Sequence, residues 1–307
     1  MCPAVDFLEV YKIDKTFRIY TPEALDPNET DPNMHGMSKP VANVGSSNRI
    51  VARVFIQASE AIKNISVKNS INKDDVLRCM HRCKEYLLIC EDKQEFICKE
   101  VERIFNICQK GELKKEGNHF TNFPQVDHLD EYCGVFLNNA KLMIQTLAEL
   151  INTFYKTSFD GPRFDKVIKW SRTALKHNNE FVQFLKEIQP GLKHIIDLRN
   201  TQEHPKKDRK LVIENFTLKS GNEISPPLWY LSGEKPYAIH SDLASIVDFL
   251  IVAVECTFLY CFMDNIDSSF TFIVISIDDS ALDPICPIKY RIEPYIVMPK
   301  NNPEKQN

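Results

Sequence analysis

The chain has 307 residues, of which 43% are hydrophobic and 26% are charged, and its formal net charge is -4 at pH 7. This length and apolar content allow a large buried core in one domain or in two. Glycine is scarce, at 9 residues against 17 prolines, which excludes the collagen-like and mainly disordered classes. The acidic balance gives the molecule no general basic field, so any contact with a polyanion must be local.

Residues 1 to 46 are rich in Pro, Asn and Asp, and we expect them to be mostly irregular, with a short ordered piece around FLEVYKI. A helical N-terminal part should follow over residues 47 to 125. Apolar residues spaced by three and four predict one helix over residues 50 to 65, capped by Ser46 or Ser47. They also predict a long helix, or a broken pair, from about residue 72 to residue 108.

The cysteines lie partly in this second helical stretch. Five of the ten are Cys79, Cys83, Cys90, Cys98 and Cys108. The N-terminus has an acidic residue at Asp6 and no apolar run after a basic start, unlike a secretory signal peptide. We therefore expect reduced thiols that pack as small hydrophobes in a cytoplasmic protein. The alternative is zinc, but the Cys79-x3-Cys83 pair, with His81 between its members, lacks a second ligand pair at zinc spacing.

The region from residue 126 to residue 298 is expected to form a helical bundle with added β structure. A helix of about thirty residues should begin at Leu129. A second should run from Phe164, with apolar residues at alternating fours and threes, to Pro190-Gly191. A shorter third helix should stop at Pro205.

Beyond residue 210 the apolar period changes to that of strands. LVIENFTL (211 to 218) and PLWYLS (227 to 232) predict a β-hairpin with Gly221-Asn222 in its turn. FTFIVISI (270 to 277) and IKYRIEPYIV (288 to 297) predict two more strands.

Between these pairs of strands, residues 241 to 263 predict an apolar helix. We expect a buried core helix and no membrane span, since Asp248 and Glu255 interrupt the apolar run. The polar tail, residues 299 to 307, is expected to be disordered. The predicted fold class is therefore mainly α, a helical bundle with a small C-terminal β appendage.

One short stretch combines chemically useful side chains at the end of a predicted helix: DLRNTQEHP, residues 197 to 205. Its Arg199-Asn200-x3-His204 pattern, followed by Pro205, resembles the signature of HEPN domains. These are α-helical bundles found in prokaryotic toxins, in antiviral ribonucleases and in some eukaryotic proteins. The resemblance implies a HEPN-like bundle within residues 126 to 298.

A second Arg-to-His spacing, from Arg172 to His177, lies within a predicted helix. Residues five apart on a helix diverge by about 140°, and Thr173 stands where the motif has Asn. Pro205, in contrast, disfavours helical geometry at the residue before it, which frees His204 to turn back. The residues of the first motif are therefore the predicted site.

The resemblance implies a metal-independent endoribonuclease, with no cofactor, acting as a toxin or antiviral defence effector. His204 would be the general base or acid on the ribose 2′-hydroxyl and the leaving oxygen, a role that suits imidazole. Arg199 would stabilise charge on the phosphate, and Asn200 would orient the phosphate or the histidine. The nucleophile would be the 2′-hydroxyl, and the product would carry a 2′,3′-cyclic phosphate. A homodimer with a composite site is also implied.

The residues that follow the motif are basic: Lys206, Lys207, Arg209 and Lys210. We expect this run to contact the RNA backbone despite the acidic total charge. The expected partners are RNA, a second copy of the chain and an antitoxin or other regulatory protein, but no membrane.

The same residues allow a structural interpretation. Arg199 and Glu203 are four apart and could form an ordinary helix ion pair, and His204 in the last turn would favour the helix dipole. The alternative function is then a non-catalytic HEPN-like helical scaffold or sensor that serves dimerisation and protein binding.

Overall fold

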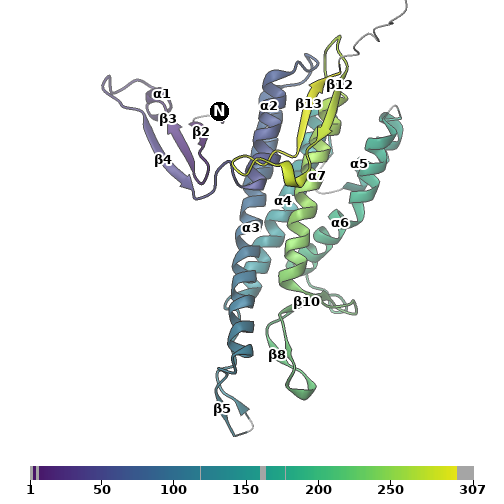
Figure 1. Cartoon of the computed structure of the whole chain (residues 1–307). Helices are drawn as coiled ribbons and strands as arrows, with labels where there is room; N and C mark the ends of the chain where they lie inside the picture. Colours follow the sequence, from purple (N-terminus) through teal and green to yellow (C-terminus); the bar gives the residue numbers. More distant parts are fainter. Residues whose placement is uncertain (1–2, 5–6, 118, 160–163, 177, 296–307) are drawn as a thin grey trace, which may run out of the picture. The chain divides into compact units, whose positions relative to one another are not determined.

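The structure, a computed structural model, describes the chain except for residues 1–2, 5–6, 118, 160–163, 177 and 296–307. As predicted, the described residues are mainly α-helical (Figure 1). They form two compact units: unit 1 contains residues 1–77 and 261–307, and unit 2 contains residues 78–260. The tail expected to be disordered, residues 299 to 307, lies outside the described residues.

Unit 1 contains a four-stranded antiparallel sheet where we expected a mostly irregular segment. Its strands, in spatial order, are β1 (Pro3–Ala4), β2 (Phe7–Tyr11), β3 (Thr16–Tyr20) and β4 (Met37–Ala42). The cross-strand pairs Leu8 with Ile19 and Val10 with Phe17 set apolar side chains opposite one another, which stabilises a sheet. The Pro- and Asp-rich composition belongs mainly to the β3–β4 connection, which includes the short helix α1 (Pro22–Leu25).

The rest of unit 1 follows the predicted pattern more closely. A π-helical turn, η1 (Val51–Ile56), continues into α2 (Gln57–Asn64). Asn48 caps this helix in place of the predicted serines: its Oδ1 accepts hydrogen bonds from the amides of Ile50 and Val51 at 2.8 and 3.3 Å. The two predicted C-terminal strands form the antiparallel hairpin β12 (Phe272–Ser276) and β13 (Tyr290–Pro294), with the short turn η3 (Asp279–Ala281) in the connection.

Unit 2 is a helical bundle. The long second helix is unbroken, α3 (Lys73–Gln109), and starts at the end of unit 1. The others are α4 (Leu129–Tyr155), α5 (Phe164–Ala174), α6 (Asn179–Glu203) and α7 (Ile239–Met263). Ring contacts join several of them: Phe96 with Tyr132, Phe154 with Phe258, Tyr155 with Trp170 and Phe181 with Tyr260.

The boundaries of α5 and α6 differ from the prediction. The helix expected from Phe164 to Pro190 ends at Ala174, and Asn178 caps a new helix by accepting a hydrogen bond from the Phe181 amide at 3.1 Å. This new helix, α6, continues through Pro190. Proline in a helix interior removes one hydrogen bond, but buried residues lie on α6 both before and after it, so packing outweighs the local penalty.

The β structure of unit 2 lies between α6 and α7, apart from the short pair β5 (Lys115–Glu116) and β6 (His119–Phe120). The predicted hairpin is confirmed: β7 (Leu211–Glu214) pairs with β10 (Leu228–Leu231), and β11 (Tyr237–Ala238) adds a third strand. Inside its connection, β8 (Thr217–Leu218) and β9 (Ile224–Ser225) flank η2 (Ser220–Asn222). Gly221 and Asn222 both have positive φ there, at 79° and 63°, as the predicted turn requires.

Helix α7 is long and apolar enough to span a membrane by length and composition. In the most apolar 18-residue window, 67% of the residues are buried inside the protein. The described part of the chain therefore uses most of this window as protein core, in agreement with the predicted core helix.

Candidate functional site

The predicted site residues lie at the C-terminal end of α6. His204 is the first residue past the helix, with φ -130° and ψ 67°, while its amide still donates to the Asn200 carbonyl at 2.9 Å. This non-helical backbone is what Pro205 imposes on the residue before it. The expectation that His204 leaves the helix is confirmed, and its side chain is exposed.

An open pocket of about 400 Å³ lies beside this helix end. Its lining consists of Asp197, Asn200, Thr201, His204, Lys206 and Arg209. The first four are spaced as i, i+3, i+4 and i+7, so they share one face of α6. The other two come from the loop after the helix, where the Lys206 amide donates to the Arg209 carbonyl at 2.9 Å and the Arg209 amide to the Lys206 carbonyl at 3.3 Å.

The charge of this pocket is mainly positive. Lys206 and Arg209 are cations, imidazole becomes one on protonation, and the single carboxylate is that of Asp197. Arg209 Nη2 lies 3.6 Å from Asp197 Oδ2, and both side chains are partly exposed. Such an exposed ion pair is weak, so an anionic ligand can compete with Asp197 for the guanidinium.

Arg199 does not line this pocket. Its Nη2 donates to Asn138 Oδ1 of α4 at 3.2 Å, and its Nη1 lies 3.2 Å from Glu203 Oε2. The Arg199 side chain is 16% exposed. The helical geometry explains this placement, because Arg199 is two residues, or about 200°, away from Asp197 and from Thr201. The structure therefore brings Asn200 and His204 together at the pocket and leaves Arg199 in a helix-to-helix contact.

A lysine from α4 completes this contact. Lys141 Nζ donates to Asn200 Oδ1 at 3.0 Å and lies 3.7 Å from Glu203 Oε2. The Asn200 amide is thus oriented by another helix, because its oxygen accepts the hydrogen bond from Lys141. Such support from a neighbouring helix is what holds a binding group in place.

The remaining predicted residues are placed as follows. Lys207 and Lys210 are exposed but do not line the pocket. Arg172 is exposed near the end of α5, and His177 lies outside the described residues. The sequence pattern missed Asp197 and Thr201, which helical spacing from Asn200 could have found, and Lys141 and Asn138, which only the packing of α4 on α6 reveals.

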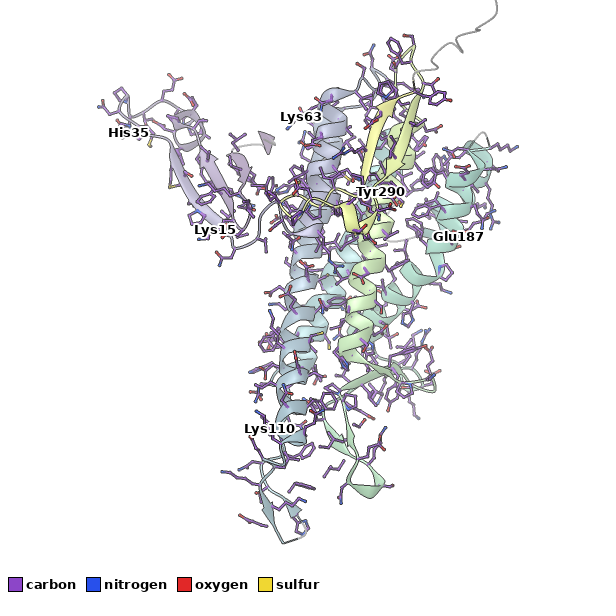
Figure 2. The ribbon with its side chains drawn as sticks, viewed as in Figure 1. Lys15, His35, Lys63, Lys110, Glu187 and Tyr290 are labelled. Atoms are coloured by element: carbon purple, nitrogen blue, oxygen red, sulfur yellow. The ribbon has the colours of Figure 1, made fainter. Side chains whose placement is uncertain are left out.

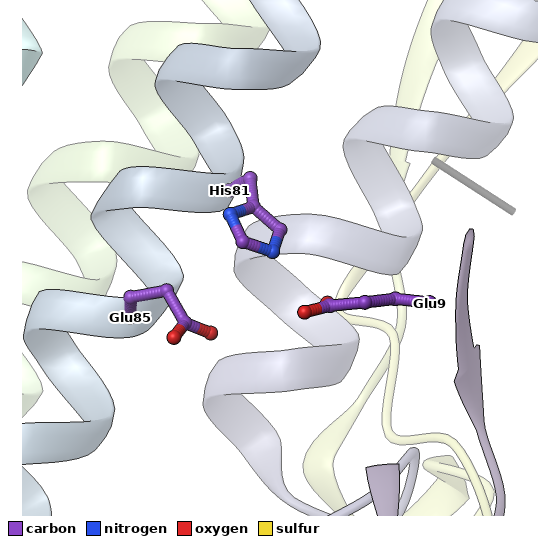
Figure 3. Close-up of side chains that lie close together, drawn as sticks. All are labelled: Glu9, His81 and Glu85. Atoms are coloured by element: carbon purple, nitrogen blue, oxygen red, sulfur yellow. The ribbon is translucent and has the colours of Figure 1, made fainter. Parts of the chain in front are cut away.

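The nine cysteines in the described part of the chain are free. Cys79 and Cys83 are buried, and burial raises the pKa of both thiols. His81 and Glu85 lie one turn apart on α3 (Figure 3). Glu9, which is drawn with them, belongs to unit 1, and the pair alone offers two groups where zinc takes four ligands.

Comparisons of the chain with protein families, with curated proteins and with solved structures gave no match. The fold and the site therefore define the protein by its structure alone. It is a mainly α-helical protein with a cationic, histidine-containing pocket where a bundle helix ends.

Proposed function

We propose that the protein is a metal-independent endoribonuclease of HEPN type, acting at the pocket beside the end of α6. The observation that carries this proposal is the pocket itself, in which an exposed histidine stands with Lys206, Arg209 and Asn200 around a space of about 400 Å³. A phosphodiester is an anion that such a set of donors can bind, and imidazole is the usual proton carrier near neutral pH.

The reaction would proceed by attack of the 2′-hydroxyl. Neutral His204 would take the proton of this hydroxyl, the 2′-oxygen would form a bond to phosphorus, and the bond from phosphorus to the 5′-oxygen would break. The 5′-oxygen would take up a proton from water, and the products would be a 2′,3′-cyclic phosphate and a 5′-hydroxyl end. Arg209 and Lys206 would stabilise the charge that develops on the phosphate oxygens.

This proposal changes the role of one residue. Arg199, the phosphate-binding residue that the resemblance implies, has its guanidinium on Asn138 and Glu203. In the proposal the pocket cations replace it, and Arg199 positions the end of α6 on which Asn200 and His204 stand.

The direct test is cleavage of a mixed RNA substrate by the full chain in EDTA. Wild type should cut it and leave 2′,3′-cyclic phosphate ends, and His204→Ala should lose at least about a hundredfold in rate. The matched control is His119→Ala, which removes another exposed histidine of unit 2 and should cut at the wild-type rate. Intact RNA after incubation with folded wild type, or equal rates for wild type and His204→Ala, would refute the proposal.

A second function, a non-catalytic scaffold, is favoured by the Arg199 contact. An arginine that joins α4 to α6 through Asn138 and Glu203 stabilises the bundle and needs no substrate. Two results would support this function: wild type binds RNA weakly and leaves it uncut, and the Arg199→Ala protein unfolds more readily than wild type.

A further inference from the structure

Strand β12 in unit 1 is apolar and exposed. Its five residues are FIVIS, and none of them is buried. Ile273, Val274 and Ile275 are each 38% exposed, and no charged residue occurs from residue 268 to residue 277. Exposed, uncharged edge strands are rare in folded proteins because they pair readily with other chains.

The backbone of β12 has one open edge. Among the described residues, β13 is its only paired strand. The Ile277 amide donates to the Lys289 carbonyl at 2.9 Å, and the Tyr295 amide to the Thr271 carbonyl at 2.7 Å. Antiparallel ladders alternate, so the odd-numbered residues of β12 direct their polar groups to β13. The even-numbered residues Phe272, Val274 and Ser276 therefore direct their N–H and C=O groups to the open edge.

The opposite edge of this hairpin is protected. By the same alternation, Tyr290, Ile292 and Pro294 of β13 face outward. The Tyr290 amide donates to Gln57 Oε1 of α2 at 2.9 Å (Figure 2 shows Tyr290), and Pro294 has no N–H to offer. Of the two outer edges of this hairpin, only that of β12 can form a regular ladder of backbone hydrogen bonds.

We propose that this edge pairs with β12 of a second copy of the chain, antiparallel and centred on a two-fold axis at Val274. In this register Val274 faces its own copy, Phe272 faces Ser276, and Ile273 faces Ile275. The residues with outward backbone groups meet one another, as a hydrogen-bonded antiparallel pair requires. No like charges meet across the axis, because the strand has none, and β-branched pairs favour the contact.

The second copy is the favoured occupant for two reasons. First, two antiparallel copies of the strand match in the positions of their outward backbone groups, and neither copy carries a charge that would repel the other. Second, the β13 edge is protected, so the assembly stops at two chains. A pair of five-residue strands is a small interface, so the dimer should be weak, with a dissociation constant in the range of about 1 μM to 1 mM.

The test measures the mass of the full chain by sedimentation over a range of concentrations. Wild type should pass from the chain mass of 35.5 kDa to twice that value. Val274→Lys and Val274→Glu should each weaken dimerisation at least about tenfold, since like charges meet on the axis. An equimolar mixture of the two variants should restore the dimer, because the introduced lysine of one copy would then face the introduced glutamate of the other.

The matched control is Ile285→Lys, an exposed isoleucine of unit 1 outside the strand, which should dimerise like wild type. Circular dichroism confirms that each variant folds. Three results overturn the proposal: a monomer at every concentration, association that Val274→Lys leaves unchanged, or no recovery in the mixture. Because mass is measured and not RNA cleavage, these results are independent of the ribonuclease proposal.

Discussion

Arg199 is the residue whose surroundings most change its expected role. Its two terminal nitrogens contact Asn138 and Glu203, while its buried Nε has no hydrogen-bond partner. A buried cation without its partners is costly, so such contacts stabilise a fold mainly by preventing that cost. Asn200 and His204, by contrast, are exposed at the pocket, where a ligand can reach them.

We therefore expect Arg199→Ala to lower the free energy of unfolding by about 1–3 kcal/mol, because the contact between α4 and α6 is lost. Urea denaturation measures this change. Arg172→Ala, which removes an exposed arginine of α5, is the control and should stay within about 0.5 kcal/mol of wild type. An Arg199→Ala protein as stable as wild type would instead favour a role for Arg199 in ligand binding.

Among the elements, α6 shows most clearly how packing overrides local signals. It passes through Pro190 and Gly191, where the sequence favours an end. Gly191 allows the close approach of α7: a Cβ at this position would lie 2.6 Å from the Cζ atom of Phe249. The absence of a side chain at Gly191 thus lets two helices that are distant in the sequence pack closely.

Gly191→Ala should consequently destabilise the protein by about 1–3 kcal/mol through overpacking against the Phe249 ring. In a Phe249→Ala background the same change should become neutral or stabilising by up to about 1 kcal/mol, since alanine favours the helix. Urea denaturation of the four proteins completes the double-mutant cycle. Equal effects of Gly191→Ala in both backgrounds would contradict the proposed contact.

At the scale of the whole molecule, the pKa of each thiol depends on how deeply the thiol is buried. Burial raises the pKa of Cys133 to about 12 and that of Cys261 well above its ordinary value. The thiolate is the reactive form, so the buried Cys133 and Cys261 thiols should react slowly in the native protein. Cys108 and Cys286 are only partly buried.

Iodoacetamide should therefore label Cys108 and Cys286 of the native protein well before Cys133 and Cys261. Mass spectrometry of the labelled peptides follows the order, and labelling in urea is the control in which all four should react at similar rates. Labelling of Cys133 as fast as Cys286 in the native protein would show that the α4 core opens readily.

Local sequence signals account for much of this protein. The apolar spacing predicts α4, the β7–β10 hairpin and the β12–β13 strands, because helix and strand periods are written in neighbouring residues. Pro205 likewise predicts the non-helical backbone of His204, since the restriction acts on the residue directly before it. Of the four-stranded N-terminal sheet, only the ordered piece around FLEVYKI, which contains β2, was expected. The other strands were missed because they are short and flank a connection whose composition signals irregular structure.

Tertiary structure decided what depends on residues far apart in the chain. The continuation of α6 through Pro190, the contacts of Arg199 with Asn138, and the orientation of Asn200 by Lys141 all need the packing of one helix on another. Which residues of β12 direct their backbone N–H and C=O groups to the open edge likewise follows from the pairing of β12 with β13. Sequence alone determined elements such as α4 and the strands of the β7–β10 and β12–β13 hairpins, because helix and strand periods are local. The tertiary contacts determined that α6 continues through Pro190 and where its side chains point, because those contacts form only on folding.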